Sequence, residues 1–211
     1  APWFSDADQF RELCRKAFFA RELEDIERDD GPSDVAVGLA WLTSRDPQEP
    51  LAKLWSEGPN EELQQLKLLD HTANNDAQWI AFRCWTVDLG FATELGSRLH
   101  VDIEPAVASL VGQMKPGRMT ANAFVKKVVK AVPVLDGGLI ANYVEQTLGA
   151  PRGLGHATAG HLLHHTILRL EARKMVELHR GDDAQGTVAF ASRTGPVTID
   201  AVTVLEAPGV N

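Results

Sequence analysis

TANAFVKKVVKAVPVLDGGLIANYVEQTLG, residues 120–149, opens the part of the chain that decides the predicted fold. Its first segment places apolar residues and lysines at helical spacing, and Thr120 is a suitable N-cap. VPVLDGG forms a turn, and a second apolar segment runs from Leu139 to Leu148 before Gly149. The stretch therefore predicts two consecutive amphipathic helices.

A third helix and a pair of strands are predicted to follow. Thr158 or His156 begins the helix, whose inward face carries Leu163, Ile167 and Leu170. MVELHR (175–180) and TVAFAS (187–192) form the strands, joined by GDDAQG. VTIDAVTV (197–204) pairs with them or covers their edge. Three helices followed by a two-stranded wing are the order of a winged helix.

The first half repeats this plan. Ser5 begins a first helix, Ser33 caps a second that Pro47 stops, and short helices follow near residues 51–55 and 60–70. Asn75 caps a further helix that Gly90 ends. FATELGSRLHVDI (91–103) alternates around Gly96 and Ser97, which predicts a hairpin, and Pro105 suits the start of a connecting helix.

We therefore predict a mostly helical α+β protein with tandem winged-helix (helix-turn-helix) units. KPGR at 115–118 interrupts the helical pattern and sets the predicted domain boundary. Residues 1–114 would form an acidic helical or winged-helix-like domain. Residues 115–211 would form a basic winged-helix domain with a C-terminal strand.

Charge is divided unevenly between these halves. Residues 1–114 carry 10 basic and 21 acidic side chains, a net of −11, whereas residues 115–211 carry 11 and 8, a net of +3. Within residues 115–180 the numbers are 10 and 4. Because phosphate is attracted by the basic part only, a nucleic-acid contact is expected in the second half.

The composition is that of an ordinary globular protein, with 211 residues, 44% hydrophobic and 24% charged. No apolar run approaches the roughly 20 residues of a membrane span, and the N-terminus lacks the features of a signal peptide. We expect a cytoplasmic protein without membrane contact. The chain starts without methionine, and the sequence leaves open whether it is a fragment of a longer protein.

The predicted third helix of the second half carries a basic stripe at a spacing of four residues, extended by lysines of the first helix and an arginine of the preceding loop. The predicted nucleic-acid-binding residues are Lys126, Lys127, Lys130, Arg152, His161, His165, Arg169, Arg173 and Lys174. A charged outer face is also what any surface helix presents. Asp182 and Asp183, at the predicted wing tip, oppose the approach of phosphate.

Catalytic motifs are not found in the sequence. It has no G-x-S-x-G elbow, P-loop or GxGxxG, and its carboxylates form no pair singled out for acid-base chemistry. His161, His164 and His165 lack a further well-spaced ligand, so no metal and no cofactor is predicted. Cys14 and Cys84 are expected to be packing residues. We predict that the chain is not an enzyme.

All five tryptophans lie in the acidic half. Most are expected in the core, with one or two at a protein-protein surface, where tryptophan is enriched.

Several phrases resemble the DpdG-like proteins encoded beside bacterial systems that modify or restrict DNA. They are DVAVGLAWLTSRDP (34–47), WIAFRCWTVDLGFA (79–92), HVDIEPAV (100–107), AVPVLDGGLIANYVEQTLG (131–149) and HTILRLEARKMVELHRGDDA (165–184). The resemblance implies a non-catalytic winged-helix component of an antiphage DNA-restriction system, working with ATPase or nuclease partners. It implies no catalytic residues.

The predicted function is DNA binding, most simply of duplex DNA, and recruitment within a defence or DNA-processing complex. The acidic N-terminal half would contact other protein subunits. One alternative is a protein-protein adaptor that does not touch DNA. Another is a dimeric transcriptional regulator with one preferred palindromic site.

Overall fold

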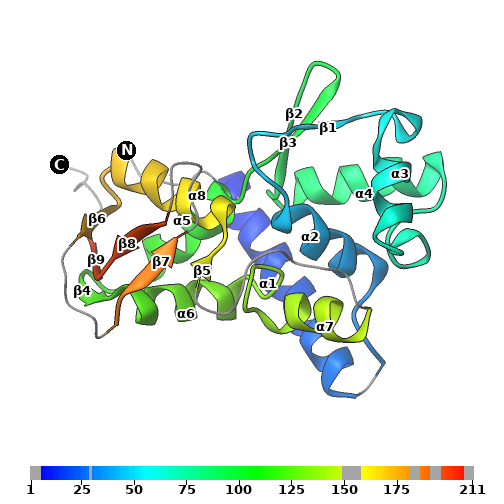
Figure 1. Ribbon diagram of the computed structural model, residues 1–211. Coiled ribbons are helices and arrows are strands. Elements are labelled where there is room, and N and C mark those ends of the chain that lie inside the picture. The colour runs from blue at the N-terminus through cyan, green and yellow to red at the C-terminus, as the bar shows by residue number, and fades with distance from the viewer. Residues whose placement is uncertain (1–5, 29, 149–157, 181–185, 191–195, 207–211) are drawn as a thin grey trace.

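The structure is a computed structural model that describes residues 6–28, 30–148, 158–180, 186–190 and 196–206 (Figure 1). In these residues helices dominate and three small sheets accompany them. The prediction of a mostly helical α+β protein is confirmed. The predicted helix start at Ser5 lies outside the described residues.

The first half consists of helices followed by a hairpin and a connecting helix. Its elements are α1 (Asp6–Glu27), α2 (Asp34–Ser44), β1 (Leu51–Ala52), the 3-10 turn η1 (Trp55–Glu57), α3 (Pro59–Gln65), η2 (Leu69–His71), α4 (Asp76–Asp88), β2 (Ala92–Leu95), β3 (Arg98–Val101) and α5 (Glu104–Gln113).

Local sequence signals set the ends of these helices. The Ser33 hydroxyl caps α2 by accepting a hydrogen bond from the Ala36 amide, and the Asn75 side chain caps α4 through the Gln78 amide, 3.0 Å away. Gly90 follows α4 with a φ of 74°, a left-handed conformation that favours glycine. Three predicted boundaries are thereby confirmed.

Gly38 allows α2 and α4 to approach closely. A Cβ atom at this position would lie 2.4 Å from the Phe82 ring of α4, so a larger residue could not fit without a shift. Trp41 and Trp79 meet in the same contact, with ring centroids 6.2 Å apart. The core of the first half is therefore built on the inner faces of these two helices.

The prediction of a short helix at residues 51–55 is wrong. Leu51 and Ala52 form strand β1, which pairs antiparallel with β3 and completes a sheet of order β1-β3-β2. Both residues are buried. Two apolar residues in a row fit a helix or a strand equally well, and here the distant partner strand decides.

The second half again places three longer helices before its last strands. Its elements are β4 (Gly117–Thr120), α6 (Ala121–Ala131), α7 (Leu139–Thr147), β5 (Thr158–Ala159), α8 (His161–Ala172), β6 (Val176–His179), β7 (Val188–Phe190), β8 (Val197–Ile199) and β9 (Ala201–Val204).

The predicted pairing of residues 175–180 with 187–192 is wrong, whereas the predicted pairing of VTIDAVTV (197–204) with these strands is confirmed. Strand β6 pairs with β9 and not with β7, and β4 joins on the other side to give the order β4-β9-β6. Strand β7 instead pairs with β8, antiparallel, and with β5, parallel, in a separate sheet. The segments 175–180, 187–192 and 197–204 have similar apolar alternation. Periodicity alone therefore did not show which of these segments pair with each other.

The start of the third helix is also corrected. α8 begins at His161 after Gly160, and Thr158 belongs to strand β5. The alternative start at His156 lies outside the described residues.

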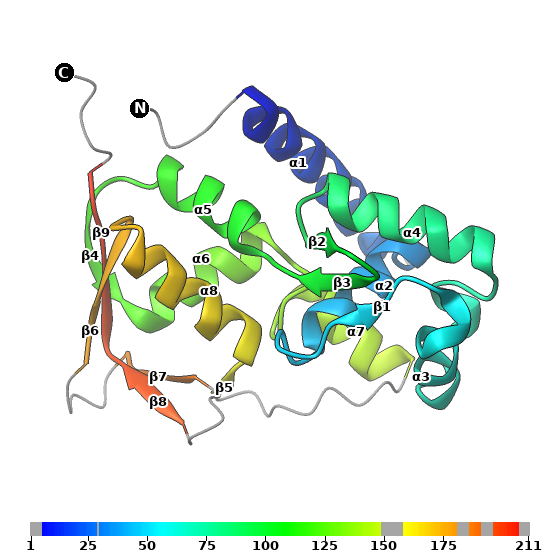
Figure 2. The same ribbon diagram turned by 90° about the horizontal axis from the view of Figure 1, so that it is seen from above.

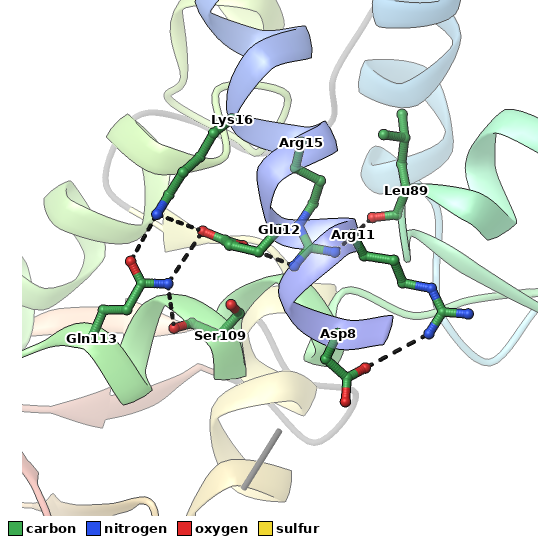
Figure 3. Close-up of polar contacts among 8 residues, drawn as sticks. All are labelled: Asp8, Arg11, Glu12, Arg15, Lys16, Leu89, Ser109 and Gln113. Atoms are coloured by element: carbon green, nitrogen blue, oxygen red, sulfur yellow. Dashed lines mark hydrogen bonds and ion pairs between the residues drawn. The ribbon is translucent and has the colours of Figure 1, made fainter. Parts of the chain in front are cut away.

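α1 connects α4 to α5 (Figure 3). The buried Arg15 guanidinium donates to the Leu89 carbonyl at the end of α4, 2.9 Å away, and pairs with Glu12 at 2.8 Å. Lys16 donates to the Gln113 side chain of α5, also at 2.8 Å. Burial raises the pKa of Glu12, but hydrogen bonds and charges of Arg15 and Lys16 outweigh it, so this pKa lies below its usual value.

The two halves share one hydrophobic core. α7 packs against α2 and α1, and α5 packs against α8. Thr43 of α2 is buried, with its hydroxyl 2.9 Å from the Val134 carbonyl. Figure 2 shows α6, α8 and their sheet at one end of the molecule, α3 and α4 at the other, and α2 and α7 between them. The division into domains at residue 114 stays a prediction.

Candidate nucleic-acid interface

Helix α8 buries one face and exposes the other. Leu163, Ile167 and Leu170 are buried, as predicted. His164 is buried as well, and its ring stacks on Phe190 with centroids 5.6 Å apart. His165 points away from this core and is exposed. α8 therefore has the two-sided character that the predicted basic stripe requires.

The two arginines of this stripe bind carboxylates of the first half. The Arg169 guanidinium lies 3.1 Å from Asp102 Oδ1 and 2.5 Å from Glu104 Oε2. Arg173 Nη1 lies 2.5 Å from Glu104 Oε1. Glu104 is only 6% exposed and joins both guanidinium groups. We refer to Asp102, Glu104, Arg169 and Arg173 as the carboxylate clamp.

The start of α5 positions both carboxylates. Glu104 is the first residue of α5, where the helix dipole favours a negative charge. Its amide donates to Asp102 Oδ1 at 2.9 Å, so the same aspartate holds the helix start and Arg169. Asp8, Pro105 and Ala108 line the adjoining cavity of about 170 Å³.

The clamp pairs both arginines at the end of α8 with carboxylates. Two guanidinium groups face two carboxylates, so the four side chains are formally neutral together. A phosphate that took the place of Glu104 would leave a nearly buried carboxylate without its partners, which is costly. The arginines of α8 are thus committed to a contact between the halves.

Helix α6 presents the three predicted lysines on its outer side. Thr120 caps the helix by accepting from the Ala123 amide at 3.2 Å, and Phe124 and Val128 are buried. Lys126, Lys127 and Lys130 lie on the opposite side and are exposed. Among the residues that the structure describes, these ammonium groups have no hydrogen bond or ion pair. They are available for phosphate.

The other predicted residues lie apart from these two groups. Lys174 is exposed in the turn after α8, with a φ of 58°. His161 is half-buried, and His165 Nε2 is 3.2 Å from Gln48 Nε2 of the first half. Arg152 lies outside the described residues. Figure 1 shows α6 along the lower edge of the second half and α8 along its upper edge, so the lysines of α6 and the arginine of α8, Arg169, lie on separate helices.

Two basic residues beside α6 were not predicted as part of the interface. Lys115 and Arg118 are exposed, and Arg118 lies on β4, which leads directly into α6. The signal was present in KPGR, which we used only to place a boundary. These residues extend the basic character of the α6 region.

One acidic side chain of the first half, Glu94, is paired near the turn end of the β2–β3 hairpin. Glu94 of β2 lies 2.5 Å from Lys53 Nζ and 2.7 Å from Arg83 Nη2. The hydrogen bond from Lys53 lowers the pKa of Glu94, burial opposes this, and Arg83 adds to the lowering, so this pKa is below its usual value. The contact fastens the hairpin to α4.

The comparison with protein families places the chain. A family model described as DpdG-like matches residues 4–184. The chain belongs to the DpdG-like family. Members of this family are components of Dpd DNA-modification defence systems. No curated protein and no solved structure gives a significant match.

Within the described ranges, His, Cys, Asp and Glu side chains do not gather in a group of three or more that could hold a metal ion. None of the helices in the described part of the chain has the length and apolarity needed to span a bilayer.

Proposed function

We propose that this DpdG-like chain is a non-catalytic component that contacts duplex DNA and recruits other subunits of a Dpd defence system. The supporting observation is the exposed lysine face of α6. Lys126, Lys127 and Lys130 share one side of a helix, have no partner in the described part of the chain, and adjoin Arg118. Such a face attracts the phosphate backbone without reading base edges.

Each half is proposed to be a winged-helix unit. In the first half, α2, α3 and α4 precede the β2–β3 hairpin, and β1 joins its edge. In the second half, α6, α7 and α8 precede the β6–β9 pair, and β4 joins its edge. In the second unit the middle helix α7 packs against α2 and α1 of the first half.

The proposed DNA contact is sequence-tolerant. A winged helix that reads bases uses side chains of its third helix, but the clamp occupies Arg169 and Arg173. Backbone contacts by lysines remain. Affinity should therefore fall steeply with salt, with a log-log slope of roughly −0.9 for each phosphate that a lysine neutralises.

The test measures the affinity for duplex DNA of the wild type and of two matched double variants. Fluorescence anisotropy of labelled duplex gives this affinity at low and at moderate salt. Lys126→Glu with Lys127→Glu changes the α6 face. Lys67→Glu with Arg98→Glu makes the same change in net charge at exposed positions of the first half. The first variant should lose at least about tenfold in affinity and flatten the salt slope by about 2, and the second should bind nearly as wild type.

Equal affinities of the two variants would contradict the α6 interface. Absence of duplex binding by wild type at low salt would favour the adaptor function. A dimer with one preferred palindromic site, seen by sedimentation and site selection, would instead favour the transcriptional regulator.

A further inference from the structure

Helix α4 exposes an uncharged face. Ala77, Ile80, Ala81, Cys84 and Trp85 are all exposed, and the side chains of Ile80 and Trp85 retain 53% and 50% of their accessible surface. The face extends for about 12 Å along the helix, at 1.5 Å per residue. A single exposed apolar side chain is ordinary, but five uncharged neighbours on one helix face form a continuous patch.

The charges of α4 lie outside this patch. Asp76 and Asp88 stand at its two ends, both exposed and without an ion pair among the described residues. Arg83 is directed to the hairpin, where it donates to Glu94 and to the Lys53 carbonyl at 2.7 Å. The patch is therefore apolar in the middle and negative at both ends.

The position of α4 leaves the patch accessible. α4 packs on α2 and β2 through its inner face, where Trp79 and Phe82 are buried. Figure 2 shows the helix along the outer edge of the first half. The inner face thus stabilises the fold, and the outer face is left for a partner.

Charge selects among the conceivable partners. Phosphate would be repelled by Asp76 and Asp88, and α4 offers no exposed basic residue to compensate. A second copy would place aspartates against aspartates, because antiparallel pairing of two α4 helices sets Asp76 opposite Asp88 and parallel pairing sets each opposite itself. A segment with basic ends and an apolar middle matches both features.

We infer that the outer face of α4 docks an amphipathic helix of a partner protein, with apolar side chains over Ile80 and Trp85 and lysine or arginine near Asp76 and Asp88. This rests on the recruitment part of the proposed function and is independent of DNA contact. The mode is a helix laid against a helix face by apolar anchors. Tryptophan in the centre of such a contact usually contributes much of the affinity.

The probe is a fluorescein-labelled synthetic helical peptide with leucines on one face and lysines at both ends, compared with the same peptide carrying glutamates at its ends. Anisotropy should show saturable binding of the lysine-ended peptide only. Ile80→Ser with Trp85→Ser should weaken it at least about tenfold. Leu95→Ser with Leu139→Ser removes equally exposed leucines elsewhere and should leave affinity unchanged.

Two further measurements distinguish loss of peptide binding from loss of folding: a charge-reversed variant and protection of Cys84 from alkylation. Asp76→Lys with Asp88→Lys should reverse the preference toward the glutamate-ended peptide. On the wild-type chain, the bound lysine-ended peptide should protect the exposed Cys84 from alkylation. Peptide binding should persist in the Lys126→Glu, Lys127→Glu variant, which separates this inference from the DNA proposal.

Several outcomes would overturn the inference. They are no saturable binding of the lysine-ended peptide, equal binding of both peptides, or binding that survives loss of Ile80 and Trp85. Loss of a dimer in sedimentation on the same substitutions would assign the face to a second copy. Loss of duplex affinity on the same substitutions would assign it to DNA.

Discussion

Helices α4 and α8 hold the same place in the order of their halves, each as the last helix before a strand pair, but their outer faces differ. The outer face of α4 is uncharged between two aspartates, whereas Arg169 of α8 and Arg173 at its C-cap are held by Glu104. The shared order therefore does not give the two helices a shared role. What each can bind depends on the side chains that folding leaves exposed.

The largest expected effect is the difference in unfolding free energy between substitutions on the inner and on the outer face of α4. Trp79 is 1% exposed and its indole donates to the Lys53 carbonyl at 2.9 Å, whereas Trp85 is 50% exposed. Trp79→Ala should lower the free energy of unfolding by about 3–5 kcal/mol, and Trp85→Ala by about 0.5 kcal/mol or less. Urea unfolding of both variants measures this. Similar losses would show that the outer face is not free.

Breaking the clamp should have the next largest effect. Glu104→Ala removes the carboxylate that holds both arginines, and about 1–3 kcal/mol of unfolding free energy should be lost, since the arginines themselves are about half exposed. Glu61→Gln, an exposed glutamate of α3, is the control. Duplex affinity should rise in Glu104→Ala, because two guanidinium groups become available to phosphate. Unchanged stability and affinity would show that the clamp is not formed in solution.

Local signals predicted much of the fold. Ser33, Asn75 and Thr120 cap the helices that they were expected to cap, because a cap depends on residues within one turn. The hairpin around Gly96 was also predicted, since its strands are adjacent in sequence. Such features need no knowledge of the rest of the chain.

Distant pairings account for what the sequence did not predict. Strand β6 pairs with β9, although β7 and β8 lie between them in the sequence. Strand β1 likewise pairs with β3, although α4 lies between them in the sequence. The clamp joins Glu104 to Arg173, 69 residues away. The sequence placed the basic stripe on α8, but the carboxylates that contact its arginines belong to the first half, which periodicity within one helix cannot show.

The caps of the two halves allow a smaller test. Asn75→Ala removes the acceptor of the Gln78 amide in α4, and Thr120→Ala removes that of the Ala123 amide in α6. Each should lower the free energy of unfolding by about 1 kcal/mol. Gln64→Ala in α3 provides an exposed control. If only one half loses stability in a separate transition, the halves unfold independently despite their shared core.

The smallest expected effect is the pH dependence contributed by Glu94. Its pKa in the folded chain is lowered below 4.5 by Lys53 and Arg83, against the opposing effect of burial, so the unfolded chain binds a proton more readily than the folded one. The stabilisation is therefore complete above the unfolded value and is lost as the pH falls through the lowered folded value.

Because Glu94 is partly exposed, solvent screens the interaction, and the loss should stay below about 1 kcal/mol. Urea unfolding between pH 6 and pH 3 for wild type and Glu94→Gln, in steps of roughly half a pH unit, would reveal it as a difference that shrinks toward low pH. Glu61→Gln again serves as the control. A constant difference would mean that Glu94 acts through packing and hydrogen bonding and not through its charge, and the hairpin would then be fastened to α4 without help from electrostatics.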